Sequence, residues 1–85
     1  MTPTIVVWHD AHADPSGGWV MPGDIDQRPY EVTSVGWLLP ADGGGKPGHV
    51  TLAQSHGQIA GDPPEAWDHV LHVPCGMVVR MVVAR

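Results

Sequence analysis

The chain has one cysteine, no phenylalanine and only four basic residues, and each scarcity excludes a class of protein. With Cys75 alone, no disulfide can form within these 85 residues, which excludes a small fold held by internal disulfides. We expect Cys75 to be a small buried apolar residue in a reducing compartment. Nine acidic residues outnumber the four basic ones for a net charge of −5, which disfavours nucleic acid as a partner because phosphate neutralisation needs Lys and Arg.

Long hydrophobic runs are also missing. The apolar run at 77–84 is interrupted by Arg80 and is too short to span a bilayer. The first residues, MTPTIVVW, have no basic stretch before their apolar segment, so they do not match a secretory signal. We therefore expect a cytoplasmic protein without a membrane partner.

Recognised catalytic motifs are absent as well. No Gly-x-Ser-x-Gly or HExxH pattern occurs in the chain. The segment DGGGKPG at 42–48 contains a lysine after three glycines, but it lacks the spacing and the following helix of a phosphate-binding loop. We read it as the tip of a hairpin, and we expect a protein that is not an enzyme and has no cofactor.

What the chain does have is strand character. β-branched and aromatic residues recur in short runs, and these runs are bounded by Gly, Pro and Asp residues that favour turns. The central feature is a hairpin within 30–55, whose two arms flank the glycine-rich segment. The expected strands lie at 4–10, 18–21, 30–39, 50–55, 66–73 and 77–84.

These runs predict an all-β fold with five to six short strands and at most one helical turn, at 22–27. Residues 1–85 then form one domain, a small and strongly bent antiparallel barrel. A chain of this length buries only about 60–65% of the surface that its unfolded form exposes, so a monomer would be marginally stable. The last run, at 77–84, is apolar on both faces and suits a central strand or a subunit interface. We therefore expect a homo-oligomer.

Two histidine pairs have the same spacing of three residues. They are His9 with His12, and His69 with His72. Imidazole is a common ligand for zinc, but on a straight strand this spacing places the two rings on opposite faces. We predict no metal site, and a metal-dependent enzyme built on these four histidines remains a competing hypothesis.

Four tryptophans are many for so short a chain without phenylalanine. We expect most of the bulky core to come from them, above all from Trp8 and Trp37 in the middle of strands. Tryptophans beside loops could instead stack on a flat ligand. With nearby histidines and arginines, the predicted ligand-binding residues are Trp19, Trp67, His12, His56, Arg28 and Arg80.

Several motifs resemble those of small uncharacterised proteins encoded by bacteriophages and prophages. These motifs are VWHDAH at 7–12, TSVGWLL at 33–39, VTLAQS at 50–55 and VPCGMV at 73–78. The resemblance covers most of the chain and carries no known activity. It implies a viral accessory protein that acts in the bacterial cytoplasm.

The order of expected elements is similar to that of Sm-like and SH3-like barrels. In Sm-like proteins the last strands pair between subunits, and 77–84 suits that role. The acidity of the chain and its missing N-terminal helix depart from Sm-like RNA binders. We therefore expect a non-enzymatic binding protein that sequesters a nucleotide-derived immune signalling molecule, as an anti-defence sponge. An inhibitor that binds a host protein and an Sm-like RNA-binding protein are the alternatives.

Overall fold

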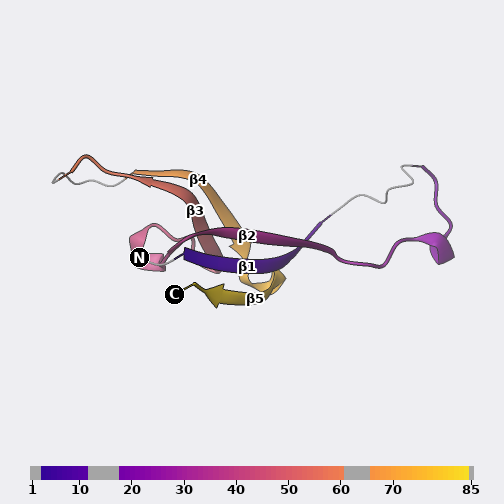
Figure 1. Ribbon diagram of the computed structural model, residues 1–85. Coiled ribbons are helices and arrows are strands. Elements are labelled where there is room, and N and C mark those ends of the chain that lie inside the picture. The colour runs from indigo at the N-terminus through magenta and orange to yellow at the C-terminus, as the bar shows by residue number, and fades with distance from the viewer. Residues whose placement is uncertain (1–2, 12–17, 61–65, 85) are drawn as a thin grey trace.

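Five strands and three short turns make up the computed structural model, which describes residues 3–11, 18–60 and 66–84 (Figure 1). In chain order the elements are β1 (Pro3–Asp10), η1 (Pro22–Asp24), β2 (Tyr30–Leu39), η2 (Ala41–Gly43), β3 (His49–Gly57), β4 (Ala66–Pro74), η3 (Cys75–Met77) and β5 (Val78–Val83). The described residues contain no α-helix. The predicted all-β class is confirmed.

The strands form a single antiparallel sheet in the order β4-β3-β2-β1-β5. β1 pairs with β2 along its whole length, from Pro3 opposite Trp37 to Asp10 opposite Tyr30. Within the described part of the chain, β4 and β5 are the two edges and do not pair with each other. The sheet is therefore open, and closure into a barrel is not seen within one chain.

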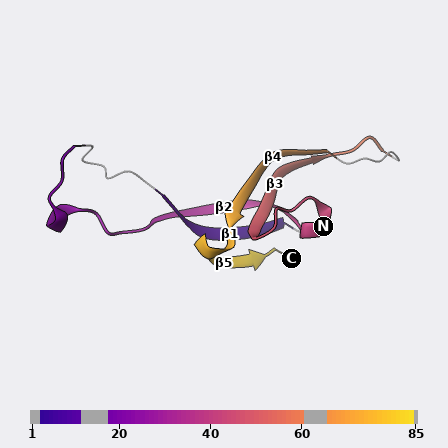
Figure 2. The ribbon, with the colours of Figure 1, turned by 180° about the vertical axis from the view of Figure 1, so that it is seen from behind.

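The sheet bends sharply between β2 and β3. Only the last three residues of β2 pair with β3, and beyond them β3 and β4 run at a steep angle to β1 and β2 (Figures 1 and 2). Gly36 lies at the start of this bend. A Cβ atom there would lie 2.7 Å from the backbone oxygen of Ala53, so only glycine lets the two strands cross so closely.

The core is small and aliphatic. Its buried residues are Val6, Val7, Leu39, Leu52, Ala53 and Val73, with the polar Thr4 and Thr51. The prediction that tryptophans supply the core is wrong. Trp8 and Trp37 are only half-buried, because the open sheet has no second layer thick enough to cover an indole. Trp8 donates its Nε1 hydrogen to Ser34 Oγ at 3.0 Å.

Three other expectations need correction. Residues 18–21 form no strand, because no neighbouring strand lies beside them to pair with. The described residues form three helical turns, whereas at most one was expected. Each turn begins at a proline or directly after one, and proline favours turn geometry. Cys75 is exposed, because it lies in η3 between the two edge strands.

The molecule is elongated. Its extents are 60 × 23 × 22 Å, and its radius of gyration is 16.9 Å. A compact chain of this length would have a radius of gyration of about 12 Å. The accessible surface is 6301 Å², which is about 1,400 Å² more than a compact 9.1 kDa monomer exposes. The described residues 18–29 form an arm that extends away from the sheet and contributes much of this length (Figure 1).

The β5 edge exposes both apolar side chains and backbone amides. Val79, Met81, Val82 and Val83 are each between 42% and 50% exposed. The amide of Ala84 donates to the carbonyl of Pro3 at 2.9 Å. Because alternate residues of an antiparallel ladder point to opposite sides, the amides of Met81 and Val83 point away from β1. Such an edge is suited to pairing with another strand.

Candidate functional site

Two of the six predicted ligand-binding residues lie together. His56 of β3 is directly opposite Trp67 of β4, and their ring centroids are 4.6 Å apart at an interplanar angle of 38°. Both residues are half-buried. The two rings contact each other in a tilted arrangement at the outer part of the β3–β4 hairpin.

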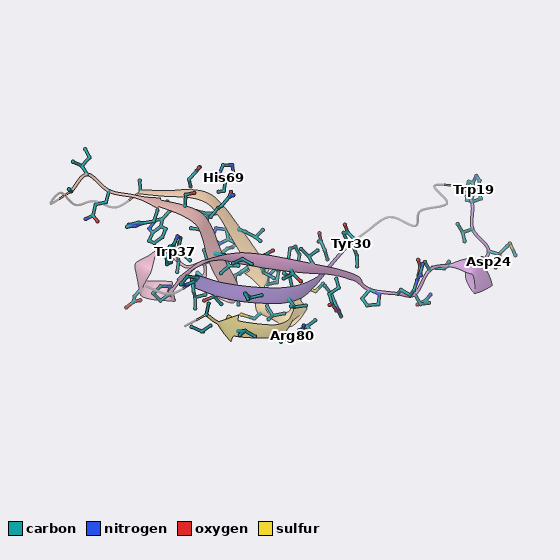
Figure 3. All side chains as sticks on the ribbon, viewed as in Figure 1. Trp19, Asp24, Tyr30, Trp37, His69 and Arg80 are labelled. Atoms are coloured by element: carbon teal, nitrogen blue, oxygen red, sulfur yellow. The ribbon has the colours of Figure 1, made fainter. Side chains whose placement is uncertain are left out.

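The other described residues of the predicted set lie elsewhere. Trp19 is fully exposed on the arm, far from the hairpin (Figure 3). Arg80 lies on β5 opposite Val7, on the exposed edge. His12 lies outside the described residues. A single chain therefore does not gather the predicted set around one cavity.

Arg28 is already engaged on the arm. Its Nε and Nη2 atoms donate to the two carboxylate oxygens of Asp26 at 2.9 Å and 2.7 Å. Its backbone amide also donates to Asp26 Oδ1 at 3.0 Å. The hydrogen bond and the negative charge of Asp26 raise the pKa of the Arg28 guanidinium. A phosphate would have to compete with this carboxylate for the same donors.

An open cavity of about 280 Å³ lies beside the ring pair, and we call it the β3–β4 pocket. Its polar groups are the Ser34 hydroxyl, the Gln54 amide and the His69 imidazole. Its full lining is Ser34, Val35, Leu52, Ala53, Gln54, His69 and Leu71. Beyond Gln54 and His69, the His56–Trp67 pair is the next pair on the same face of these two strands, about 7 Å along the ladder. The pocket, with its apolar walls and few polar groups, and the ring pair therefore lie on the same face of the β3–β4 hairpin.

His69 has an uncommon backbone conformation. Its φ is 52°, and it is the only non-glycine with a positive φ among the described residues. The ladder passes from the Ala53–Val70 pair to the Ser55–Asp68 pair without a bridge at His69. A left-handed conformation costs an L-residue about 1–2 kcal/mol, and such strain often lies at binding sites.

The side chain of His69 is held by its neighbour. The Nδ1–H group donates to Asp68 Oδ2 at 2.8 Å, because a carboxylate oxygen can only accept. His69 lines the β3–β4 pocket, and Nε2 is the ring nitrogen that this contact does not use. The carboxylate therefore determines which ring nitrogen of His69 carries the hydrogen.

The backbone of His69 gives a prediction about stability. In an ordinary strand position, valine is more stable than glycine by up to about 1 kcal/mol. At a φ of 52° the order should reverse, because a β-branched residue avoids this region and glycine does not. We expect His69→Gly to be more stable than His69→Val by about 1–2 kcal/mol in urea unfolding. If His69→Val is as stable as His69→Gly or more stable, the strand is regular at this position in solution.

Two polar residues of the pocket, Ser34 and Gln54, were not among the predicted ligand-binding residues. His69 was considered only as a metal ligand. The sequence did contain a signal for Ser34. Val32, Ser34 and Gly36 share one face of β2, and Ser34 is the polar residue among them. No sequence signal marks the left-handed conformation of His69.

Comparison of the chain with protein-family models, with curated proteins and with solved structures gives no match. The site is therefore interpreted from its own geometry. The described residues contain no group of three or more His, Cys, Asp or Glu side chains arranged to hold a metal ion. They also contain no helix of the length and apolarity that a membrane span requires.

Proposed function

We propose that this chain is a non-enzymatic, homo-oligomeric binding protein whose β3–β4 pocket takes a small flat ligand of nucleotide type. The observation that carries the proposal is the His56–Trp67 ring pair beside an open cavity of about 280 Å³. Ligand sites typically combine apolar walls with a few polar groups that fix orientation. This surface has that composition.

Each part of the surface has a role in the proposal. The exposed face of the ring pair stacks on a base, which contributes about 1–3 kcal/mol per stacked base. The Gln54 amide and His69 Nε2 bind the polar edge of the base or a sugar hydroxyl. Basic residues for a phosphate come from Arg80 or Arg28 of a neighbouring copy, because neither lies on this hairpin.

Self-association is supported by the open sheet. The chain exposes about 1,400 Å² more than a compact monomer, which is enough for a standard contact of about 800 Å² per partner and part of a second. The β5 edge offers outward amides and exposed valines to a partner strand. In this proposal, strands of neighbouring copies complete the strongly bent barrel. The order of the strands along the chain resembles that of Sm-like and SH3-like barrels.

The biological setting in this proposal follows from the resemblance to phage proteins. The protein acts in the cytoplasm of a bacterial host and sequesters a nucleotide-derived immune signal. Sequestration requires only binding, which agrees with a site that has a stacking surface and few polar groups. Sequestration also requires this chain to hold the ligand longer than the receptor of the bacterial host does.

Ligand binding is tested by calorimetry with cyclic nucleotides and cyclic ADP-ribose isomers. We expect Trp67→Leu to weaken binding about tenfold or more, because leucine is apolar but cannot stack. The matched variant Trp67→Phe keeps a ring and should lose much less. If the natural protein binds none of these compounds at high micromolar concentration, the proposal fails.

An inhibitor that binds a host protein is the second candidate. The observation that favours it is the arm, where Trp19, Met21 and Ile25 are all exposed without a covering layer. Tryptophan is a frequent anchor of protein interfaces. Capture of one host protein by the natural chain, lost with Trp19→Ser and retained with Trp67→Leu, would favour this candidate over the sponge. An Sm-like RNA binder should instead retain RNA on purification. The ion pair between Arg28 and Asp26 speaks against it, because it leaves fewer basic side chains for RNA phosphates.

A further inference from the structure

The structure pairs two histidines that are far apart in sequence. His49 is the first residue of β3, and His72 lies on β4. The register places His49 opposite Pro74 and Thr51 opposite His72, so the two histidines are diagonal neighbours on one face of the hairpin. Their ring centroids are 6.3 Å apart, and the planes are nearly perpendicular at 83°. Neither ring is buried, so solvent ions can reach both.

The tautomer of His49 is fixed by its backbone neighbour. Its Nδ1 atom lies 2.8 Å from the carbonyl oxygen of Pro47. A carbonyl oxygen only accepts, so Nδ1 carries the hydrogen. In the neutral ring, Nε2 then has the lone pair. Histidines that bind metals commonly donate their other N–H group in this way.

His72 is held in a comparable manner. Its Nδ1 atom lies 2.9 Å from Oγ1 of Thr51, which is fully buried. The same Oγ1 accepts the backbone amide of Lys46 at 3.0 Å and is fixed by the glycine-rich loop. The Thr51 hydroxyl can accept the Nδ1–H of His72 or donate its own hydrogen to Nδ1, and Nδ1 is engaged in both cases. Here too Nε2 is the nitrogen left for a ligand.

We propose that His49 and His72 bind one divalent transition-metal ion such as Zn²⁺ through their Nε2 atoms. Zn–N bonds of about 2.0–2.1 Å place two imidazole centroids roughly 5–6 Å apart, close to the separation in this structure. Two protein ligands leave the remaining positions to water, where a catalytic zinc site has three protein ligands and one open position. Imidazole selects zinc, nickel or copper over magnesium and calcium, which prefer oxygen.

The other histidines in the described part of the chain have different neighbours, and His56 contacts Trp67. His69 donates to Asp68, and His9 lies 3.4 Å from Glu31 on the β1–β2 part of the sheet. The site therefore differs from the His69–His72 pair, whose spacing of three residues does not favour a shared metal ion on a strand. An ion at this site would join the edge strand β4 to β3 beside the glycine-rich loop.

Calorimetric titration of the full chain with ZnCl₂ tests this site. We expect one ion per chain, with binding weakened about tenfold or more in His49→Asn and in His72→Asn. Asparagine keeps a hydrogen-bonding group near the position of Nδ1 and removes Nε2, so the local structure should persist. The circular dichroism spectrum of each variant checks its fold.

Three controls make the result decisive. His69→Asn, His9→Asn and Cys75→Ser should each bind Zn²⁺ as the natural chain does, and MgCl₂ should give no binding. Unchanged affinity in either His49→Asn or His72→Asn, or loss of binding in any of the three controls, would overturn the proposal.

Discussion

The Met81→Lys/Val83→Lys double variant should be a monomer at concentrations where the natural chain is an oligomer. Both side chains are exposed, at 45% and 42%, and the amides of both residues point away from β1. Lysine on an edge strand opposes pairing with another chain, because its charge would have to leave water. Burying two such apolar side chains contributes about 3 kcal/mol or more, so association should weaken about 100-fold or more.

Light scattering coupled to size exclusion measures this change directly. The matched control is Met21→Lys/Ile59→Lys, which adds the same charge and removes the same kind of exposed apolar side chain outside the sheet. It should keep the oligomer mass. A natural chain that is a well-folded monomer would refute both the edge contact and the shared-barrel proposal, whereas ligand binding by that monomer would leave the pocket proposal intact.

Substitution of Gly36 should strongly destabilise the sheet where β2 and β3 cross. In Gly36→Ala, the new methyl group would lie 2.7 Å from the Ala53 carbonyl oxygen and 3.2 Å from Leu52 Cβ. The first neighbour is backbone, so the strands must separate at the sharpest part of the sheet. Overpacking of this kind costs about 1–3 kcal/mol, a large part of the stability of a small domain.

Urea unfolding compares this variant with Gly57→Ala. Gly57 ends β3, and a Cβ atom there would meet no other atom within 4 Å. We expect the control to change the free energy of unfolding by less than about 1 kcal/mol. Equal stability of the two variants would mean that β2 and β3 do not cross closely at Gly36 in solution. Loss of the oligomer in Gly36→Ala alone would show that the bend also orients the edges.

The strands were predictable because their signals are local. Alternating β-branched residues located β1, β4 and β5 within one or two residues, and the glycine-rich segment marked the turn between β2 and β3. The burial of individual residues was not predictable from such signals. Trp8 and Trp37 have the size of core residues, but an open five-strand sheet has too little depth to bury them.

The candidate site was only partly predictable for a related reason. His56 and Trp67 were recognised by residue type, and only the register could show that they face each other. The role of His69 depends on a backbone angle, and the pairing of His49 with His72 depends on strands that are distant in sequence. Residue spacing along one strand predicts faces, whereas such sites need the alignment between two strands.

The two edges of the sheet are different strands, and this has a geometric consequence for assembly. If β4 of one copy joins β5 of the next, each added copy leaves one β4 and one β5 open at the ends of the chain of copies. Growth then stops only when a fixed rotation per copy returns the last edge to the first. A small change in sheet curvature would convert a finite ring into a fibre.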